Sequence, residues 1–343
     1  SESTTQNYNH LKIHSQYSIC EGAIKIDDLK EFSKTNKIQS LGLSDTTNLC
    51  GALEFAEKIS KVGTQPIIGT QINFKYSDIV GLLPLFALDE EGYKRIIKLS
   101  SFSFLNNDEL SEPHLDFNEL LEDTHGVAVL SGTIFGLFGQ LFDKGKFTEI
   151  KDIYNKLKEK FGDRFYLEIQ RHNDQNELSF EKFNLNKSLE LSIPLIATNE
   201  VFYLNKDMHE AHDALICIGR KTYINDKTRK RYSDQHYLKS NLEMAELFSD
   251  LPEALENNYN FPLRCNFRPS FSNPILPNIR SEKGGNADDI LKKDSLHGLK
   301  DKFHKVFGIK NNEIENNNIF LKYKDRLDHE LSIIIEMKYA SYF

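Results

Sequence analysis

Short apolar runs alternate with amphipathic, helix-like segments along roughly the first 270 residues, and this alternation limits the possible folds more than any other feature. The strand-like runs are residues 10–14, 41–44, 66–69, 82–88, 127–131, 165–169 and 193–198. Helical spacing is found between them at residues 49–63, 89–100, 148–161 and 207–218. Successive strand–helix units form a largely parallel sheet whose carboxyl-terminal strand ends share one face. The roughly seven units counted here therefore predict an α/β barrel.

The alternation stops in a proline-rich segment, residues 262–277. Helix-like stretches follow at 288–307 and 322–337, and the chain ends on an apolar segment, 339–343. Because an exposed apolar end is unusual for a complete domain, we interpret it as a truncation inside a second domain. The expected parts are a disordered or artificial start (1–6), a barrel domain (7–273), and a linker with the truncated start of the second domain (274–343).

The formal net charge of the 343 residues is −8. An acidic domain does not neutralise phosphates, so we expect weak or no DNA binding by this chain alone. The basic run 227–231 is a local exception, and it is either a DNA contact or a solvated loop. No apolar run is long enough to span a bilayer and the start carries no export signal, which predicts a cytoplasmic protein without membrane association. The four cysteines lack CxxC spacing and are expected to be reduced thiols.

The first strand-like run carries the most promising polar pattern. Residues 10–22 read HLKIHSQYSICEG, and alternation along a strand points His10, Lys12 and His14 to one face. Polar residues also follow later strands, in LSDTTN, LSGT and ATNEVF. Barrel enzymes place their sites at such strand ends. The alternative interpretation is an ordinary strand with polar ends.

Other chemistries have little support in the sequence. Ser131 is not part of a nucleophile elbow, and no glycine-rich phosphate-binding loop occurs. The remaining histidines are scattered, and we expect them on the surface or as helix caps: His114, His125, His172, His209, His212 and His236.

Several segments occur in the order seen in the PHP domain of bacterial DNA polymerase III alpha subunits. They are HLKIHSQYS, LSDTTNLCGALEF, QPIIGTQI, DEEGYKRIIKLSS, IPLIATNEV and YSDQHYLKS. The chain resembles this family from Tyr8 onward, and residues 326–343 resemble the segment that leads the family into its palm domain. The resemblance implies a PHP-type (β/α)7 distorted TIM-like barrel, followed by the mostly helical start of the polymerase palm region.

Active members of the family bind metal ions, chiefly zinc, at the mouth of this barrel. The resemblance assigns the ligand positions to Lys12, His14, Glu21, Thr46, Gln71, Leu82, Thr133, Glu200 and Phe202. Among these, the side chains that still suit a metal are His14, Glu21 and Glu200. A zinc site needs three or four ligands that converge on one ion, and a multi-metal site needs bridging ligands as well. The resemblance therefore implies a vestigial pocket with no metal and no catalytic residue.

Lys12 suggests a further hypothesis. Its ammonium group would replace the lost metal charge if it lay close to Glu21 and Glu200, with Asp45 as a third candidate partner. The alternative is a lysine that points to solvent.

By resemblance, the full-length parent synthesises DNA with Mg²⁺ held by palm aspartates beyond Phe343. We expect this chain to be an inactive scaffold and a docking platform for the proofreading exonuclease subunit and other holoenzyme subunits, with DNA bound through the full-length polymerase. One alternative is an active metal-dependent phosphoesterase or 3′–5′ exonuclease. Another is a stand-alone phosphatase such as histidinol phosphatase, which the palm-like segment argues against.

Overall fold

The structure is a computed structural model that describes residues 7–18, 22–105, 112–220 and 231–269, together with scattered positions beyond 292. The expected ligand position Glu21, most of the basic run 227–231 and nearly all of the expected second domain, 274–343, lie outside the described residues. Three of the four cysteines are described, and they are free and buried, as expected: Cys50, Cys217 and Cys265.

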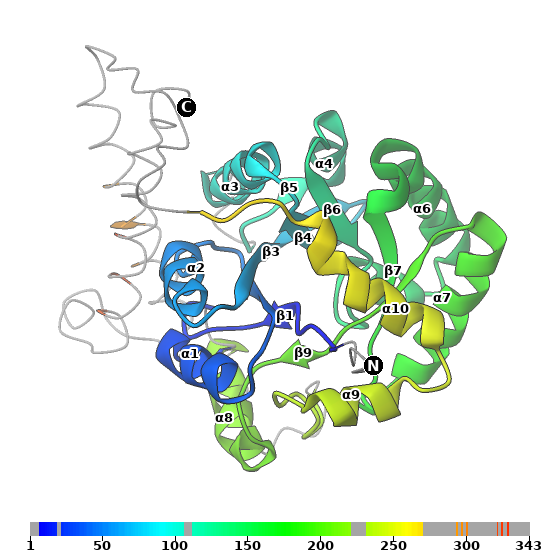
Figure 1. Cartoon of the computed structure of the whole chain (residues 1–343). Helices are drawn as coiled ribbons and strands as arrows, with labels where there is room; N and C mark the ends of the chain where they lie inside the picture. Colours follow the sequence, from blue (N-terminus) through cyan, green and yellow to red (C-terminus); the bar gives the residue numbers. More distant parts are fainter. Residues whose placement is uncertain are drawn as a thin grey trace.

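The described strands form one sheet that curls around a common centre (Figure 1). They are β1 (Lys12–Ile13), β2 (Ser40–Thr46), β3 (Gln65–Tyr76), β4 (Ile79–Ala87), β5 (Leu115–Asp116), β6 (Val127–Leu130), β7 (Phe165–Ile169), β8 (Leu195–Ala197) and β9 (Glu200–Val201). The strand order is β8-β7-β6-β4-β3-β2-β1-β9, with β5 paired to β3. Only Thr198 and Asn199 separate β8 from β9, so one extended segment pairs with β7 and then with β1. This segment closes the distorted barrel.

The sheet is less parallel than the sequence predicts, because β4 runs antiparallel to both β3 and β6. Strands β3 and β4 form a hairpin in which Tyr76 pairs with Ile79 across Ser77 and Asp78. Ser77 has a φ of 57°, and a connection of two residues can only reverse the chain. The apolar runs 66–69 and 82–88 are therefore two arms of one hairpin, and each extends further than its apolar pattern indicated.

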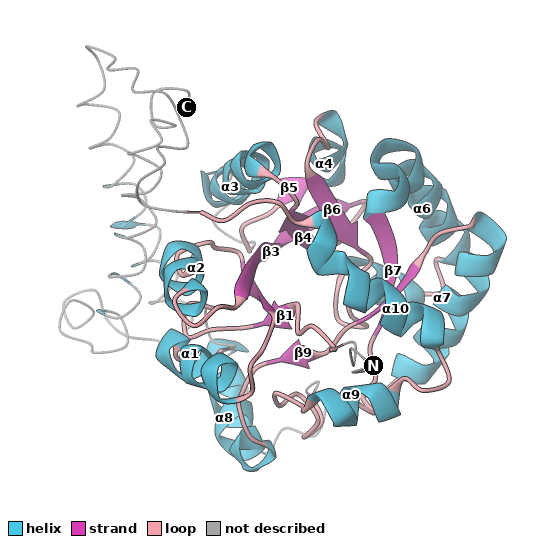
Figure 2. Cartoon of the chain, viewed as in Figure 1, coloured by secondary structure: helices cyan, strands magenta, loops and turns pink. Residues whose placement is uncertain are grey.

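Helices cover the outside of the barrel (Figure 2). They are α1 (Ile26–Thr35), α2 (Ala52–Ser60), α3 (Glu90–Leu105), α4 (Phe117–Glu122), α5 (Leu137–Asp143), α6 (Phe147–Phe161), α7 (Glu177–Leu191), α8 (His209–Arg220), α9 (Asn241–Leu247) and α10 (Pro252–Asn260), with short 3-10 turns at Gly162–Arg164, Lys206–Met208 and Phe261–Arg264. Their ends follow local chemistry. Ser240 and Glu243 form a capping box at the start of α9, and Pro252 occupies the first turn of α10.

Side chains inside the barrel change character from one end to the other. At the amino-terminal strand ends, buried apolar side chains fill the interior: Leu11, Ile67, Phe86, Ala128, Leu130, Tyr166 and Ile196. Phe261 packs edge-on against Phe86 and Tyr166, with ring centroids 5.6 and 5.8 Å away. Because side chains alternate across a strand, Glu168 and Gln170 point inward above Tyr166. The polar interior therefore lies toward the carboxyl-terminal strand ends.

Candidate functional site

A fully buried lysine lies at the centre of the polar interior. The Lys12 ammonium on β1 is 2.9 Å from Glu168 Oε2 on β7 and 2.7 Å from Glu200 Oε2 on β9. Burial alone would lower the pKa of Lys12, but the two carboxylates outweigh it and leave the pKa raised. Burial would likewise raise the pKa of Glu200, yet Lys12 and His14 hold it well below its usual value. Lys12 and Glu200 are therefore both charged near neutral pH.

Hydrogen-bond donors surround the carboxylate oxygens, and Glu168 Oε1 accepts the Gly132 N–H at 3.1 Å. His14 Nε2 and Gln71 Nε2 lie 2.5 and 2.6 Å from Glu200 Oε1. The Gln170 amide donates to both acids, at 2.9 Å from Glu168 Oε2 and 2.9 Å from Glu200 Oε2. Both glutamines supply N–H groups where a metal site would need lone pairs. The carboxylates consequently have no free side on which to bind a cation.

The structure supports the geometric part of the Lys12 hypothesis, with one partner changed. Glu200 contacts Lys12 as expected, but the second carboxylate is Glu168, which the sequence analysis missed. Asp45 is engaged elsewhere: it accepts hydrogen bonds from the Ser15 N–H (2.6 Å), the Ser15 hydroxyl (2.6 Å) and the Ser18 hydroxyl (2.8 Å). Glu168 could have been found as an acid at an inward position of a buried strand.

The first strand is shorter than expected, and its three polar side chains do not share one site. Lys12 and His14 both reach Glu200. His10 instead places its Nε2 2.7 Å from the Lys239 carbonyl oxygen. The alternation predicted one face for all three side chains, but His10 precedes the two-residue strand β1 and does not join the site of Lys12 and His14.

An aromatic cluster covers the mouth of the barrel, with Phe202 at its centre. Its ring centroid lies 4.6 Å from His14, 4.8 Å from His212, 5.0 Å from Tyr232 and 5.3 Å from His236. Phe202 is 2% exposed, so these rings keep water away from the ion pairs. Phe202 also stands at a position that the resemblance assigns to a metal-binding histidine, and a phenyl ring offers no ligand atom.

The other assigned positions surround the mouth without forming a ligand set. Thr46 Oγ1 lies 3.5 Å from His14 Nδ1. Thr133 Oγ1 accepts the Phe135 N–H at 3.0 Å, which is a local turn contact. Leu82 lies in β4 and pairs with Asn73 of β3. Leu82 offers no ligand atom, and the Thr133 hydroxyl is engaged in its own turn.

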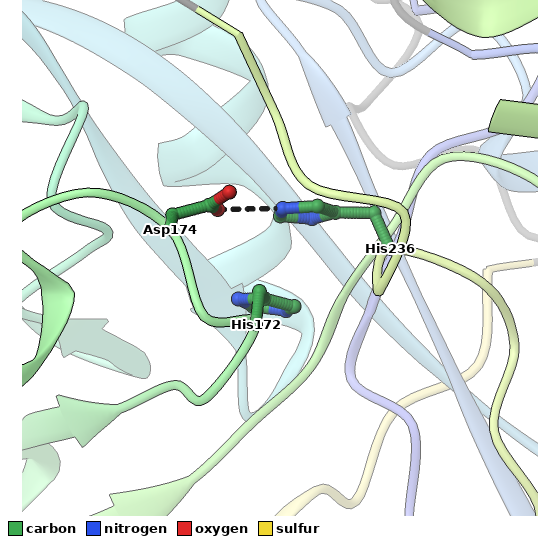
Figure 3. Close-up of side chains that lie close together, drawn as sticks. All are labelled: His172, Asp174 and His236. Carbon is green, nitrogen blue, oxygen red and sulfur yellow. Dashed lines mark hydrogen bonds and ion pairs between the residues drawn. The ribbon is translucent and has the colours of Figure 1, made fainter. Parts of the chain in front are cut away.

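His172, Asp174 and His236 lie close together behind the mouth, with one potential ligand atom from each within 4.8 Å of the others (Figure 3). All three are buried, and so is His212. The prediction that these histidines are surface or capping residues is therefore wrong for His172, His212 and His236. Contacts between the β7–α7 loop and the segment after residue 231 enclose His172 and His236, and His212 stacks on Phe202. No sequence spacing connects them.

The protonation of His172 argues against a metal ion at this cluster. His172 Nε2 accepts the Glu200 N–H at 3.1 Å, so its proton must lie on Nδ1, which faces Glu177 Oε2 at 3.0 Å. Neither ring nitrogen then has a free lone pair. The His172 and His236 rings are also stacked, 3.9 Å apart at 10°, and lone pairs in parallel ring planes do not converge on one ion.

The family model "PHP domain" matches residues 10–172, so the barrel with its polar mouth is a PHP domain. The chain is 40% identical over 336 residues to DNA polymerase III subunit alpha of Rickettsia conorii, covering 97% of this chain and 28% of that protein. It is 34% identical over 356 residues to the protein of the same name from Caulobacter vibrioides, covering 100% of this chain and 30% of the relative. The chain belongs to the family of bacterial DNA polymerase III alpha subunits, and it spans less than a third of the length of these relatives.

Among solved structures, the chain has a distant likeness to an amidohydrolase from Chromobacterium violaceum. The TM-score is 0.37 with 11% sequence identity, covering 57% of this chain and 87% of the other. A score this low supports no conclusion about activity. Among the described helices, none has the length and apolar character that crossing a membrane requires.

Acidification should destabilise the barrel between pH 6.5 and pH 4. Burial lowers the pKa of His10 and His172 from 6.5 to about 4, so their stabilising contribution is complete above pH 6.5 and is lost as the pH falls toward 4. Glu177 acts in the opposite sense, since burial raises its pKa from 4.5 to about 7, and its contribution is lost as the pH rises through that range. The two histidines outweigh the one carboxyl group, and Glu200, whose pKa is held well below its usual value, adds to the loss, so acidification should lower the free energy of unfolding.

Urea denaturation at half-unit pH steps measures how the free energy of unfolding changes with pH. A His10→Gln variant keeps a donor for the Lys239 carbonyl and removes one of the two titrating rings, so its pH profile should be flatter. A wild-type free energy of unfolding that stays constant from pH 6.5 to pH 4.5 would contradict the expected burial of neutral imidazoles.

Proposed function

We propose that this chain is the PHP region of a replicative DNA polymerase III alpha subunit and that it serves as a catalytically inactive scaffold. The observation that carries the proposal is the buried Lys12 ammonium between Glu168 and Glu200. It places a fixed positive charge among carboxylates that a metal-dependent phosphoesterase would need for its ions. The Phe202 cluster adds a barrier to substrate, because a scissile phosphate cannot reach these groups through packed rings.

The vestigial pocket supports this proposal residue by residue. Glu200 and His14 keep groups able to bind a metal, but they are bonded to each other and to Lys12 and Gln71. Zinc or manganese would have to displace the ammonium and then find further ligands at Thr46, Leu82, Thr133 or Phe202. Threonine hydroxyls are poor ligands for these metals, and the leucine and phenylalanine side chains have no ligand atom. The residues present therefore do not fit the metal cluster of an active PHP domain.

In the full-length protein the proposed activity is template-directed DNA synthesis, with Mg²⁺ in a palm site that this chain does not include. The proposed role of the barrel is to support the neighbouring polymerase domains and to dock the proofreading exonuclease subunit among other holoenzyme subunits. The family relationship supports this role. Co-elution of the full-length alpha subunit, with and without its barrel, with the exonuclease subunit tests the docking.

Metal analysis tests the proposed inactivity. Protein purified without chelators should contain well below one equivalent of zinc, manganese or iron per chain, as measured by mass spectrometry of the metals. It should also release no nucleotide from a labelled DNA 3′ end when these ions are added. If the protein instead held nearly one equivalent of metal and cleaved DNA in the 3′–5′ direction, the alternative would be established, a catalytically active PHP phosphoesterase or exonuclease.

A further inference from the structure

Glu200 lies where the barrel closes, and one edge of its short strand has no full neighbouring strand among the described residues. On the β1 side, Glu200 aligns with Lys12, and the Val201 carbonyl accepts the His14 N–H at 2.8 Å. Because successive peptide groups of a strand point to opposite sides, the N–H and C=O of Glu200 face away from β1. Buried backbone groups must find partners elsewhere.

Two histidine side chains provide these partners. His172 Nε2 accepts the Glu200 N–H at 3.1 Å, and His236 Nδ1 donates to the Glu200 carbonyl at 2.8 Å. The two rings are stacked 3.9 Å apart at an angle of 10°. They are 1% and 2% exposed. Together they bind the peptide of Glu200 in the way that an adjacent strand would.

Each ring is itself held at its other nitrogen by a carboxylate. His172 Nδ1 lies 3.0 Å from Glu177 Oε2. His236 Nε2 lies 2.7 Å from Asp174 Oδ2 (Figure 3). The carboxylates are fixed in turn: Glu177 accepts the His172 N–H, and Asp174 accepts the Ser233 N–H at 2.6 Å. A carboxylate partner of this kind fixes the orientation of an imidazole. Because the Glu200 carbonyl and Asp174 both accept, His236 makes both hydrogen bonds only when both of its ring nitrogens are protonated.

We propose that His172 and His236 are positioning residues that hold the peptide of Glu200 so that its carboxylate meets Lys12 and His14. The proposal rests on the proposed function, in which the Lys12 ion pairs replace a metal cluster. The two rings have opposite roles, since one accepts and the other donates a hydrogen bond at Glu200. An ion pair gains most when its partners are held in place, because immobilising free side chains costs entropy.

The test is a double-mutant cycle in the whole chain. His236→Phe keeps a flat ring but removes both hydrogen bonds, whereas His236→Asn can still donate to the Glu200 carbonyl. In the wild-type background, His236→Phe should raise the unfolding equilibrium constant about 100-fold. In a background with an uncharged pocket, Lys12→Met with Glu168→Gln and Glu200→Gln, the same change should raise it about 10-fold or less. His125→Phe, at an exposed histidine, is the control.

A spectroscopic measurement separates positioning from simple packing. The Lys12 ammonium should give a ¹⁵N resonance protected from water exchange in the wild type and in His236→Asn, and this resonance should broaden in His236→Phe. Equal effects of His236→Phe in both backgrounds, with an unchanged Lys12 resonance, would overturn the positioning role and leave the proposed function intact. A Lys12→Met variant as stable as the wild type would instead overturn the replacement of metal charge by Lys12, on which the positioning role also depends.

Discussion

Replacing Lys12 by methionine should destabilise the barrel by about 3–5 kcal/mol, because removing one partner of a buried ion pair leaves the others uncompensated. Here two carboxylates, Glu168 and Glu200, would remain inside the barrel with their ammonium partner gone. Methionine fills nearly the same volume, so the loss reports charge rather than a cavity. Urea denaturation of the whole chain at pH 7 measures the change in the free energy of unfolding.

Two comparisons define the origin of the effect. Adding Glu168→Gln and Glu200→Gln to Lys12→Met should recover most of the lost stability, since the pocket is then neutral. Lys58→Met is the matched control, because Lys58 also contacts two carboxylates, Asp27 at 2.7 Å and Glu54 at 2.9 Å, but is 30% exposed. It should cost less than about 1 kcal/mol. A cost for Lys12→Met as small as that for Lys58→Met would refute the charge-replacement hypothesis.

Replacing Phe202 by alanine should cost about 3–5 kcal/mol, in the range measured for buried phenylalanines. The ring is buried against His14, His212, Tyr232 and His236, and its loss would leave a cavity above Glu200. Phe147→Ala is the control, because Phe147 is 48% exposed and its removal opens no buried cavity. Thermal and urea denaturation of both variants give the comparison.

Solvent exchange adds a second measurement for Phe202. Amide hydrogens around Glu200 should exchange faster in Phe202→Ala, because water can then enter the mouth. Exchange in the Phe147→Ala variant should stay as slow as in the wild type. A Phe202→Ala variant with wild-type stability and wild-type exchange would show that the ring does not seal the barrel.

The order of the strands and helices was largely predictable because each apolar run has its own period. Runs such as 127–131 and 165–169 predict β6 and β7 closely, and the helical spacing of 148–161 predicts α6. The hairpin of β3 and β4 was not predictable in this way. The chain reverses between β3 and β4 because Ser77 adopts a positive φ, and no glycine or proline at this point marks a tight turn in the sequence.

The candidate site was predictable only where it lies at the ends of recognisable strands. Lys12, His14, Gln71 and Glu200 do meet at the mouth, as the resemblance implied. Glu168 was overlooked, since one acid in an apolar strand has no motif around it. His172 and His236 were placed on the surface, since a scattered histidine carries no information about burial.

The sequence by itself indicated that repeated strands and helices form a barrel, and that leucine, threonine and phenylalanine stand at positions to which the resemblance assigns metal ligands. The first conclusion needs only local periodicity, and the second needs the resemblance together with the chemistry of single side chains. The tertiary structure decided which charges meet. Lys12, Glu168 and Glu200 are far apart in the chain and become neighbours only because the sheet closes between β8 and β9. Electrostatic energy depends on distance and on the exclusion of water, and a linear sequence specifies neither.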